Sequence, residues 1–145
     1  MRRRTFIAAL GGAAAWPVAL RAKQSDQMRR IGILLHGVQT DPLWQKRLAA
    51  FLGELEGLGW LENRNVHIEV QYSANNYDRL PRLAHEIVTL DPDVIFANTT
   101  PAIKALQRET SSIPLIFVEV SDPVGAGVVA SLARPATTPR WRAPR

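Results

Sequence analysis

The stretch IPLIFVEVSDPVGA, residues 113–126, decides the fold. It is apolar at every position from Pro114 to Val118, which predicts a strand buried on both faces of a parallel sheet. Polar residues follow where that strand should end, and Asp122 before Pro123 is typical of a helix N-cap and first helical position. In open α/β sheets, ligands bind beyond the carboxyl ends of the strands, beside helix N-termini. The stretch therefore predicts a strand–helix unit with a candidate binding edge.

The rest of the chain repeats this pattern of strand and helix. Strands are predicted at residues 30–35, 66–72, 94–97 and 114–118, and helices after them at residues 43–58, 77–90, 101–108 and 124–132. Asp41 or Thr40 is expected to cap the first of these helices. Regular alternation with short connections predicts an α/β fold with a doubly wound parallel sheet. We expect the strand order 2-1-3-4, because the alternation of apolar and polar residues from Val66 to Tyr72 suits an edge strand.

Composition and charge exclude several classes of protein. The 145 residues suffice for roughly one domain. There is no cysteine, so disulfides and thiolate chemistry are excluded. The net charge of +5 would suit a nucleic-acid-binding protein, but eight of the 18 basic residues lie in the first 22 or the last 12 positions. Between Lys23 and Ala133 there are 10 basic and 13 acidic residues, so no nucleic-acid partner is expected.

Residues 1–22 have the layout of an export signal. Three arginines at residues 2–4 precede an apolar segment that contains glycine and proline and is short for a membrane span of about 20 residues. The sequence Arg3-Arg4-Thr5-Phe6-Ile7 resembles the twin-arginine motif. We predict cleavage after Ala22 and a periplasmic location. The general secretory route, and a retained anchor or cytosolic start, are the alternatives.

Three polar loops follow predicted strands and are expected to meet at one edge of the sheet. Their hydroxyls, amides and helix N-terminal N–H groups suit a small ligand that carries a carboxylate or hydroxyls. Thr100 and Asp122 taken alone are equally well explained as helix caps, so the conjunction of the loops carries the prediction. The predicted ligand-binding residues are Gln39, Thr40, Asn98, Thr99, Thr100, Ser121 and Asp122.

The pattern of reactive residues argues against catalysis and against a metal site. His36, His67 and His85 fall on three separate predicted elements, without the spacing of convergent metal ligands. Ser121 lacks the G-x-S-x-G elbow of a hydrolase and a histidine after the last strand. The glycines at residues 125–127 have neither phosphate-loop nor dinucleotide spacing. We therefore expect no enzyme, no metal and no cofactor, with an enzyme on a flavodoxin-like fold as the alternative.

Several segments resemble the ABC-transporter substrate-binding proteins of the TrpX-like family. They include RIGILLHG, NRNVHIE, DPDVIFANTTPAIKAL and SDPVGAG, and the resemblance runs from Met1 to about Pro135. It implies two α/β lobes of the type I periplasmic-binding kind with a small solute between them, in some members an aromatic amino acid. It also implies a membrane permease as a partner. The resemblance carries ligand contacts over only to the loops that align, which contain the seven residues named above.

Residues 134–145 depart from the family pattern. Relatives continue with a glycine-rich G-G-N-x-T-G segment and a second lobe, whereas this chain has ATTPRWRAPR, which we interpret as an aberrant or disordered basic tail. The predicted organisation is an export signal at residues 1–22, an N-terminal lobe at residues 23–133 and this tail. We expect an exported solute-binding component of an ABC importer, impaired by truncation to its first lobe. A non-functional fragment is the alternative.

Overall fold

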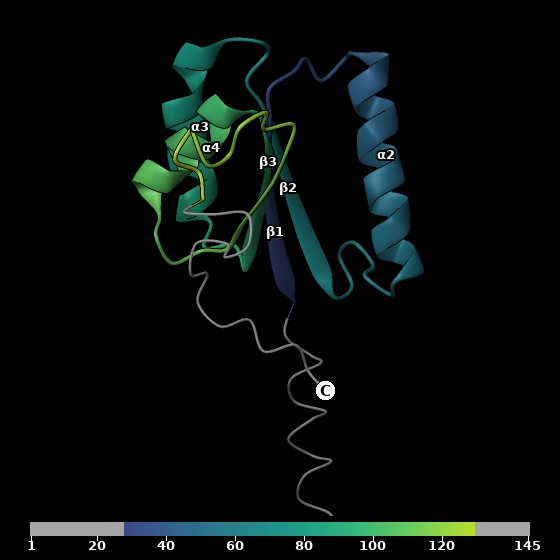
Figure 1. Ribbon diagram of the computed structural model, residues 1–145. Coiled ribbons are helices and arrows are strands. Elements are labelled where there is room, and N and C mark those ends of the chain that lie inside the picture. The colour runs from purple at the N-terminus through teal and green to yellow at the C-terminus, as the bar shows by residue number, and fades with distance from the viewer. Residues whose placement is uncertain (1–27, 130–145) are drawn as a thin grey trace, which may run out of the picture.

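The computed structural model describes residues 28–129 (Figure 1). The predicted export signal at residues 1–22 and the predicted tail at residues 134–145 lie outside this range. No helix within it is long and apolar enough to cross a membrane. The elements in chain order are β1 (Arg29–Leu35), α2 (Pro42–Gly57), β2 (Val66–Tyr72), the 3-10 helix η1 (Tyr77–Arg79), α3 (Leu80–Thr89), β3 (Val94–Asn98), α4 (Thr100–Glu109) and β4 (Leu115–Val118).

Four parallel strands form one sheet in the order β2-β1-β3-β4, which confirms the predicted fold class and strand order. Strand β1 pairs with β2 from Arg29↔Val66 to Leu35↔Tyr72, and with β3 along its other side. Strand β4 pairs with β3. Helices α3 and α4 cover one face of the sheet, and α2 lies on the other (Figure 1). All four strands therefore point their carboxyl ends toward the same edge.

Most of the buried core lies between the sheet and the layer formed by α3 and α4. Leu34 and Ile95 from the strands meet Ile87 of α3 and Ile103 of α4, and all four side chains are fully buried. A Cβ added to Gly32 of β1 would lie 2.6 Å from Ile87 Cγ2, so glycine lets α3 approach the strand closely. The hydrophobic stabilisation of the lobe is thus concentrated on this side of the sheet.

Helix α2 is held against the sheet more loosely, because none of its side chains is fully buried. Asp41 Oδ1 accepts a hydrogen bond from the backbone N–H of Leu43 at 2.8 Å. Of the two residues predicted to cap this helix, Asp41 and Thr40, Asp41 is therefore the N-cap. Farther along the helix, Phe51 stacks on Phe96 of β3 with ring centroids 5.2 Å apart. Partial burial of this kind leaves space between α2 and the sheet.

Strand β4 was expected to be buried on both faces, and this expectation is wrong. Ile116 is 54% exposed and Val118 is 40% exposed. Leu115 and Phe117, on the opposite face, pack against the core beneath α3 and α4. The physical reason is that α2 lies over the sheet without burying β4, and no other described element covers that face of β4.

The helix expected at residues 124–132 does not form over its described part, residues 124–129. Residues 123–127 make a series of turns, in which the N–H groups of Val128 and Val129 both bond to the carbonyl of Pro123. Asp122 still acts as a cap, since its Oδ1 accepts a hydrogen bond from Gly125 N at 2.8 Å. Gly127 then takes a φ of 69°, a left-handed conformation that interrupts a helix. The remainder of the predicted helix lies outside the described residues.

Candidate functional site

The three predicted loops do lie at the carboxyl edge of the sheet. They follow β1, β3 and β4, and the chain turns to opposite faces after β1 and after β3, because α2 and α4 lie on different sides (Figure 1). In open α/β sheets, ligands commonly bind at the place where the connections after two neighbouring strands turn to opposite faces of the sheet. The topology therefore supports the predicted edge, and the side chains decide which residues form a site.

Asn98, at the end of β3, connects two of these loops. Its side chain is fully buried. Its Oδ1 accepts a hydrogen bond from the backbone N–H of His36 at 2.7 Å, and its Nδ2 donates to Glu119 Oε2 at 3.1 Å. Asn98 therefore ties the loop after β1 to the loop after β4. It lines the cavity described below and positions Glu119 there.

Thr99 has an unusual backbone at the start of α4. Its φ is 69° and its ψ is 146°, a strained conformation for a β-branched residue that costs about 1–3 kcal/mol. Its N–H donates to the carbonyl of Val118 at 3.3 Å, which fixes it beside β4. Its Oγ1 is buried and has no hydrogen-bond partner among the described residues. Thr100 is half-buried and begins α4 itself.

The other predicted residues are exposed and do not line the cavity. The Gln39 carbonyl accepts a hydrogen bond from Gln45 Nε2 at 3.1 Å, while Thr40 is exposed in the same loop. Ser121 is exposed as well, and the Asp122 carboxylate is used within its own turn. The structure thus brings one of the seven predicted residues, Asn98, into the cavity wall.

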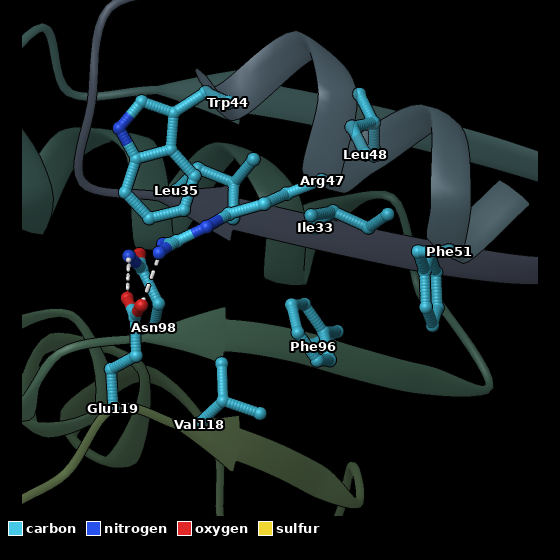
Figure 2. Close-up of a pocket in the computed structure, with 10 residues that line it drawn as sticks. All are labelled: Ile33, Leu35, Trp44, Arg47, Leu48, Phe51, Phe96, Asn98, Val118 and Glu119. Carbon is cyan, nitrogen blue, oxygen red and sulfur yellow. Dashed lines mark hydrogen bonds and ion pairs between the residues drawn. The ribbon is translucent and has the colours of Figure 1, made fainter.

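A cavity of about 200 Å³ opens between α2 and the carboxyl halves of β1, β3 and β4 (Figure 2). Most of its wall is apolar or aromatic, and three polar side chains gather toward one end, next to Trp44. The apolar part consists of Ile33, Leu35, Trp44, Leu48, Phe51, Phe96 and Val118, and the polar part of Arg47, Asn98 and Glu119. An apolar interior with a few grouped polar atoms is the usual composition of a small-molecule site.

The polar end of the cavity is built around an ion pair. Arg47 Nη1 of α2 lies 2.6 Å from Glu119 Oε1, directly after β4, and the two side chains are 48% and 43% exposed. The Arg47 guanidinium carbon also lies 4.9 Å from the centroid of the Trp44 ring, within cation–π range. A Cβ added to Gly37 would lie 2.5 Å from Trp44 Nε1, so the indole packs directly on the loop after β1. Helix α2 is thereby attached to both loops.

A second cluster lies at the same edge, beyond β1 and β2. The His36 ring stacks on Tyr77 with centroids 4.3 Å apart and planes 5° from parallel. His36 Nδ1 is 2.7 Å from Ser73 Oγ. A serine and a histidine at this distance resemble part of a hydrolase triad, but Ser73 is completely buried and so cannot reach a substrate. The pair therefore holds the loops in place.

Sequence reasoning did not name nine of the ten residues that line the cavity, among them Trp44, Arg47 and Glu119 at its polar end. Glu119 directly follows the predicted strand at residues 114–118 and precedes the predicted residues Ser121 and Asp122. The available signal was the placement of Trp44 and Arg47 in the first half of the helix that follows β1, where side chains face the carboxyl edge. The contact of Arg47 with Glu119, 72 positions away, is a property of the fold.

The geometry of the edge agrees with comparison to known proteins. The sequence model of the family described as ABC transporter substrate binding protein matches residues 37–138. This chain belongs to that family. The resemblance seen in the sequence is thus confirmed.

Curated and solved relatives agree with the family match. A tyrosine-binding protein of Clostridioides difficile is 31% identical over 113 residues, 78% of this chain and 33% of the relative. The ligand-free, open structure of a substrate-binding protein with adhesive properties from Clostridium difficile is 30% identical, with a TM-score of 0.68 over 74% of this chain and 36% of that one.

A Streptococcus pneumoniae ABC domain in complex with L-Trp shares the fold, with 23% identity and a TM-score of 0.66 over 75% of this chain and 36% of that one. The chain therefore spans about a third of the length of each of these relatives.

Proposed function

We propose that this chain forms one lobe of the solute-binding component of an ABC importer, and that its lobe provides one side of the site for a small molecule. The observation that carries this proposal is the largely apolar cavity with a charged end, located at the carboxyl edge of a parallel sheet in a member of this family. The lobe acts as a binding scaffold and not as a catalyst, since the serine of its serine–histidine pair is buried.

The solute that fits best is a free amino acid with an apolar side chain. The cavity of about 200 Å³ exceeds an engineered apolar cavity of about 150 Å³ that takes up benzene, so it has room for a single aromatic ring. Phe51, Phe96 and Trp44 offer aromatic surface to such a ring. One relative is named for binding tyrosine, and another is in complex with L-Trp.

We further propose that the protein is exported to the periplasm and that a membrane permease is its partner. Support comes from the twin-arginine-like start of the sequence and from the family. Fusing residues 1–22 to a reporter that is active only after folding in the cytoplasm and export would test the route. Replacing Arg3 and Arg4 by lysine should abolish export, whereas unchanged export would contradict a twin-arginine signal.

The binding proposal is tested with the full chain and L-phenylalanine as the probe. We expect weak binding, because the chain spans about a third of the length of its relatives and, on this proposal, provides only one side of the site. Chemical shifts of the Trp44 indole N–H, followed by NMR during titration to about 10 mM, are sensitive to dissociation constants in the millimolar range. Saturable shifts at Trp44 and none at distant His85 are expected; no shift at any residue would contradict the proposal.

A further inference from the structure

The ion pair between Arg47 and Glu119 differs from the other ion pairs between acidic and arginine side chains in the described range. Arg29–Asp93 and Arg82–Glu86 do not line the cavity. Arg47 and Glu119 both line the apolar cavity, and both are about half exposed. A positive and a negative group therefore stand side by side where a bound molecule would leave the apolar interior (Figure 2).

Both charged groups have binding capacity left for a ligand. The guanidinium of Arg47 carries five N–H donors, and one nitrogen contacts Glu119. The Glu119 carboxylate accepts one hydrogen bond from Arg47 and one from Asn98, and a carboxylate has roughly four acceptor positions. A ligand can therefore add a carboxylate to Arg47 and an ammonium group to Glu119, and both protein charges remain paired.

Neighbouring groups hold the two charges in place before a ligand arrives. Asn98 binds Glu119 Oε2 and is itself buried and bonded to the backbone of His36. The backbone of Glu119 has a φ of 57°, a left-handed conformation directly after the last residue of β4. Arg47 rests on the Trp44 ring. Preorganised charges of this kind reduce the entropy lost on binding.

We propose that Arg47 and Glu119 recognise the carboxylate and ammonium groups of a free amino acid whose apolar side chain occupies the cavity. This inference rests on the proposed solute-binding function and assigns its specificity to two residues. An amino acid presents its two opposite charges on neighbouring atoms, as the ion pair does, and its side chain leaves from the same carbon. A ligand with one charge makes only one of the two contacts with the ion pair, and the loss of a hydrogen bond to a charged group weakens binding by about tenfold or more.

The test compares three probes that share a phenyl ring and differ in charge: L-phenylalanine, 2-phenylethylamine and 3-phenylpropanoate. Their dissociation constants are measured by NMR titration of the full chain. L-phenylalanine should bind about tenfold or more tightly than either analogue. Equal binding of the three probes would overturn the charge recognition while leaving the proposed function intact. No shift with any probe at about 10 mM would overturn both.

Two variants separate recognition from a structural role. Glu119→Gln keeps an acceptor for Asn98 and should remove the advantage of L-phenylalanine over 3-phenylpropanoate. Arg47→Met keeps an apolar stem over Trp44 and should remove the advantage over 2-phenylethylamine. Each variant is checked for an unchanged melting temperature. Glu86→Gln breaks an ion pair of similar exposure on α3 and should leave all three affinities unchanged. If the variants keep the wild-type preference, the ion pair only attaches α2 to β4, and the inference is wrong.

Discussion

Replacing Asn98 by aspartate changes a single atom of a fully buried side chain, and the structure determines what that atom meets. In the native protein, the Asn98 side chain accepts a hydrogen bond from His36 N at 2.7 Å and donates one to Glu119 Oε2 at 3.1 Å. Aspartate keeps the acceptor, but it replaces the donor with a second carboxylate oxygen. The variant therefore replaces the hydrogen bond between Asn98 and Glu119 by a close contact between two negatively charged carboxylates.

The loss of folding stability in Asn98→Asp is bounded by two costs, that of charge repulsion and that of protonating the new carboxyl. Two unit charges 3.1 Å apart repel by about 5 kcal/mol at an effective dielectric constant of about 20, and the half-exposed Glu119 lowers this figure. The new carboxyl can also escape repulsion by binding a proton, which from an ordinary pKa of 3.9 costs about 4 kcal/mol at pH 7. We expect a loss of about 2–4 kcal/mol in the free energy of unfolding, roughly 10–20 °C in Tm.

Thermal and urea unfolding followed by circular dichroism would measure this loss, and two further results identify its cause. Combining Asn98→Asp with Glu119→Gln should restore most of the stability, since the new amide can donate to the aspartate. Repulsion raises the folded-state pKa of the introduced carboxyl, so the loss is full above that pKa and disappears as the pH falls toward about 4. A cost below about 0.5 kcal/mol, or no rescue by Glu119→Gln, would refute the network.

Four other substitutions test the packing. Gly37→Ala places a Cβ against the Trp44 indole and should cost about 1–3 kcal/mol and loosen the start of α2, seen as a changed Trp44 indole shift. Ile103→Ala, in the core under α4, should cost about 2–5 kcal/mol, whereas Leu52→Ala on α2 should cost clearly less; equal costs in urea unfolding would contradict the uneven core. Ile116→Lys should raise solubility with less than about 0.5 kcal/mol of destabilisation, and unchanged or reduced solubility would show that the exposed apolar face of β4 does not limit solubility.

Secondary structure and strand order were readable from the sequence because both depend on local patterns. The clean alternation in residues 66–72 marked β2 as an edge strand, and the structure places it there. The short apolar run in residues 94–97 became β3 inside the sheet. These signals arise from which side chains can face a core, and they do not require knowledge of distant contacts.

The errors came from properties that depend on neighbours or on a single backbone angle. Residues 114–118 are apolar throughout, yet apolarity does not reveal that α2 fails to cover Ile116 and Val118. The sequence around Pro123 contains a good helix start, but the left-handed backbone of Gly127 interrupts it. A pattern specifies the preference of a segment, while the packing partners decide whether that preference is met.

The candidate site was predictable as an edge and not as a set of side chains. Topology alone placed the loops after β1, β3 and β4 together. The choice among their residues depended on hydrogen bonds over long sequence distances, such as the 72 positions between Arg47 and Glu119. Asn98, one of the seven predicted ligand-binding residues, lines the cavity, and its side chain also connects two loops. Exposed polar residues such as Gln39 and Asp122 satisfied the sequence criteria without facing the cavity.

Because the two faces of the sheet are packed unevenly, ligand binding is expected to slow amide exchange mainly in α2. Helix α2 has no fully buried side chain, whereas α3 and α4 each bury four, so the backbone amides of α2 should exchange with deuterium faster than theirs. A molecule that fills the cavity would contact both Phe51 and Phe96, adding the packing that α2 lacks. L-phenylalanine should therefore slow exchange in α2 and leave α4 unchanged, as measured by mass spectrometry or NMR. Equal exchange rates in the three helices of the free chain, or slowing spread evenly over the lobe, would show that α2 is not the element that binding orders.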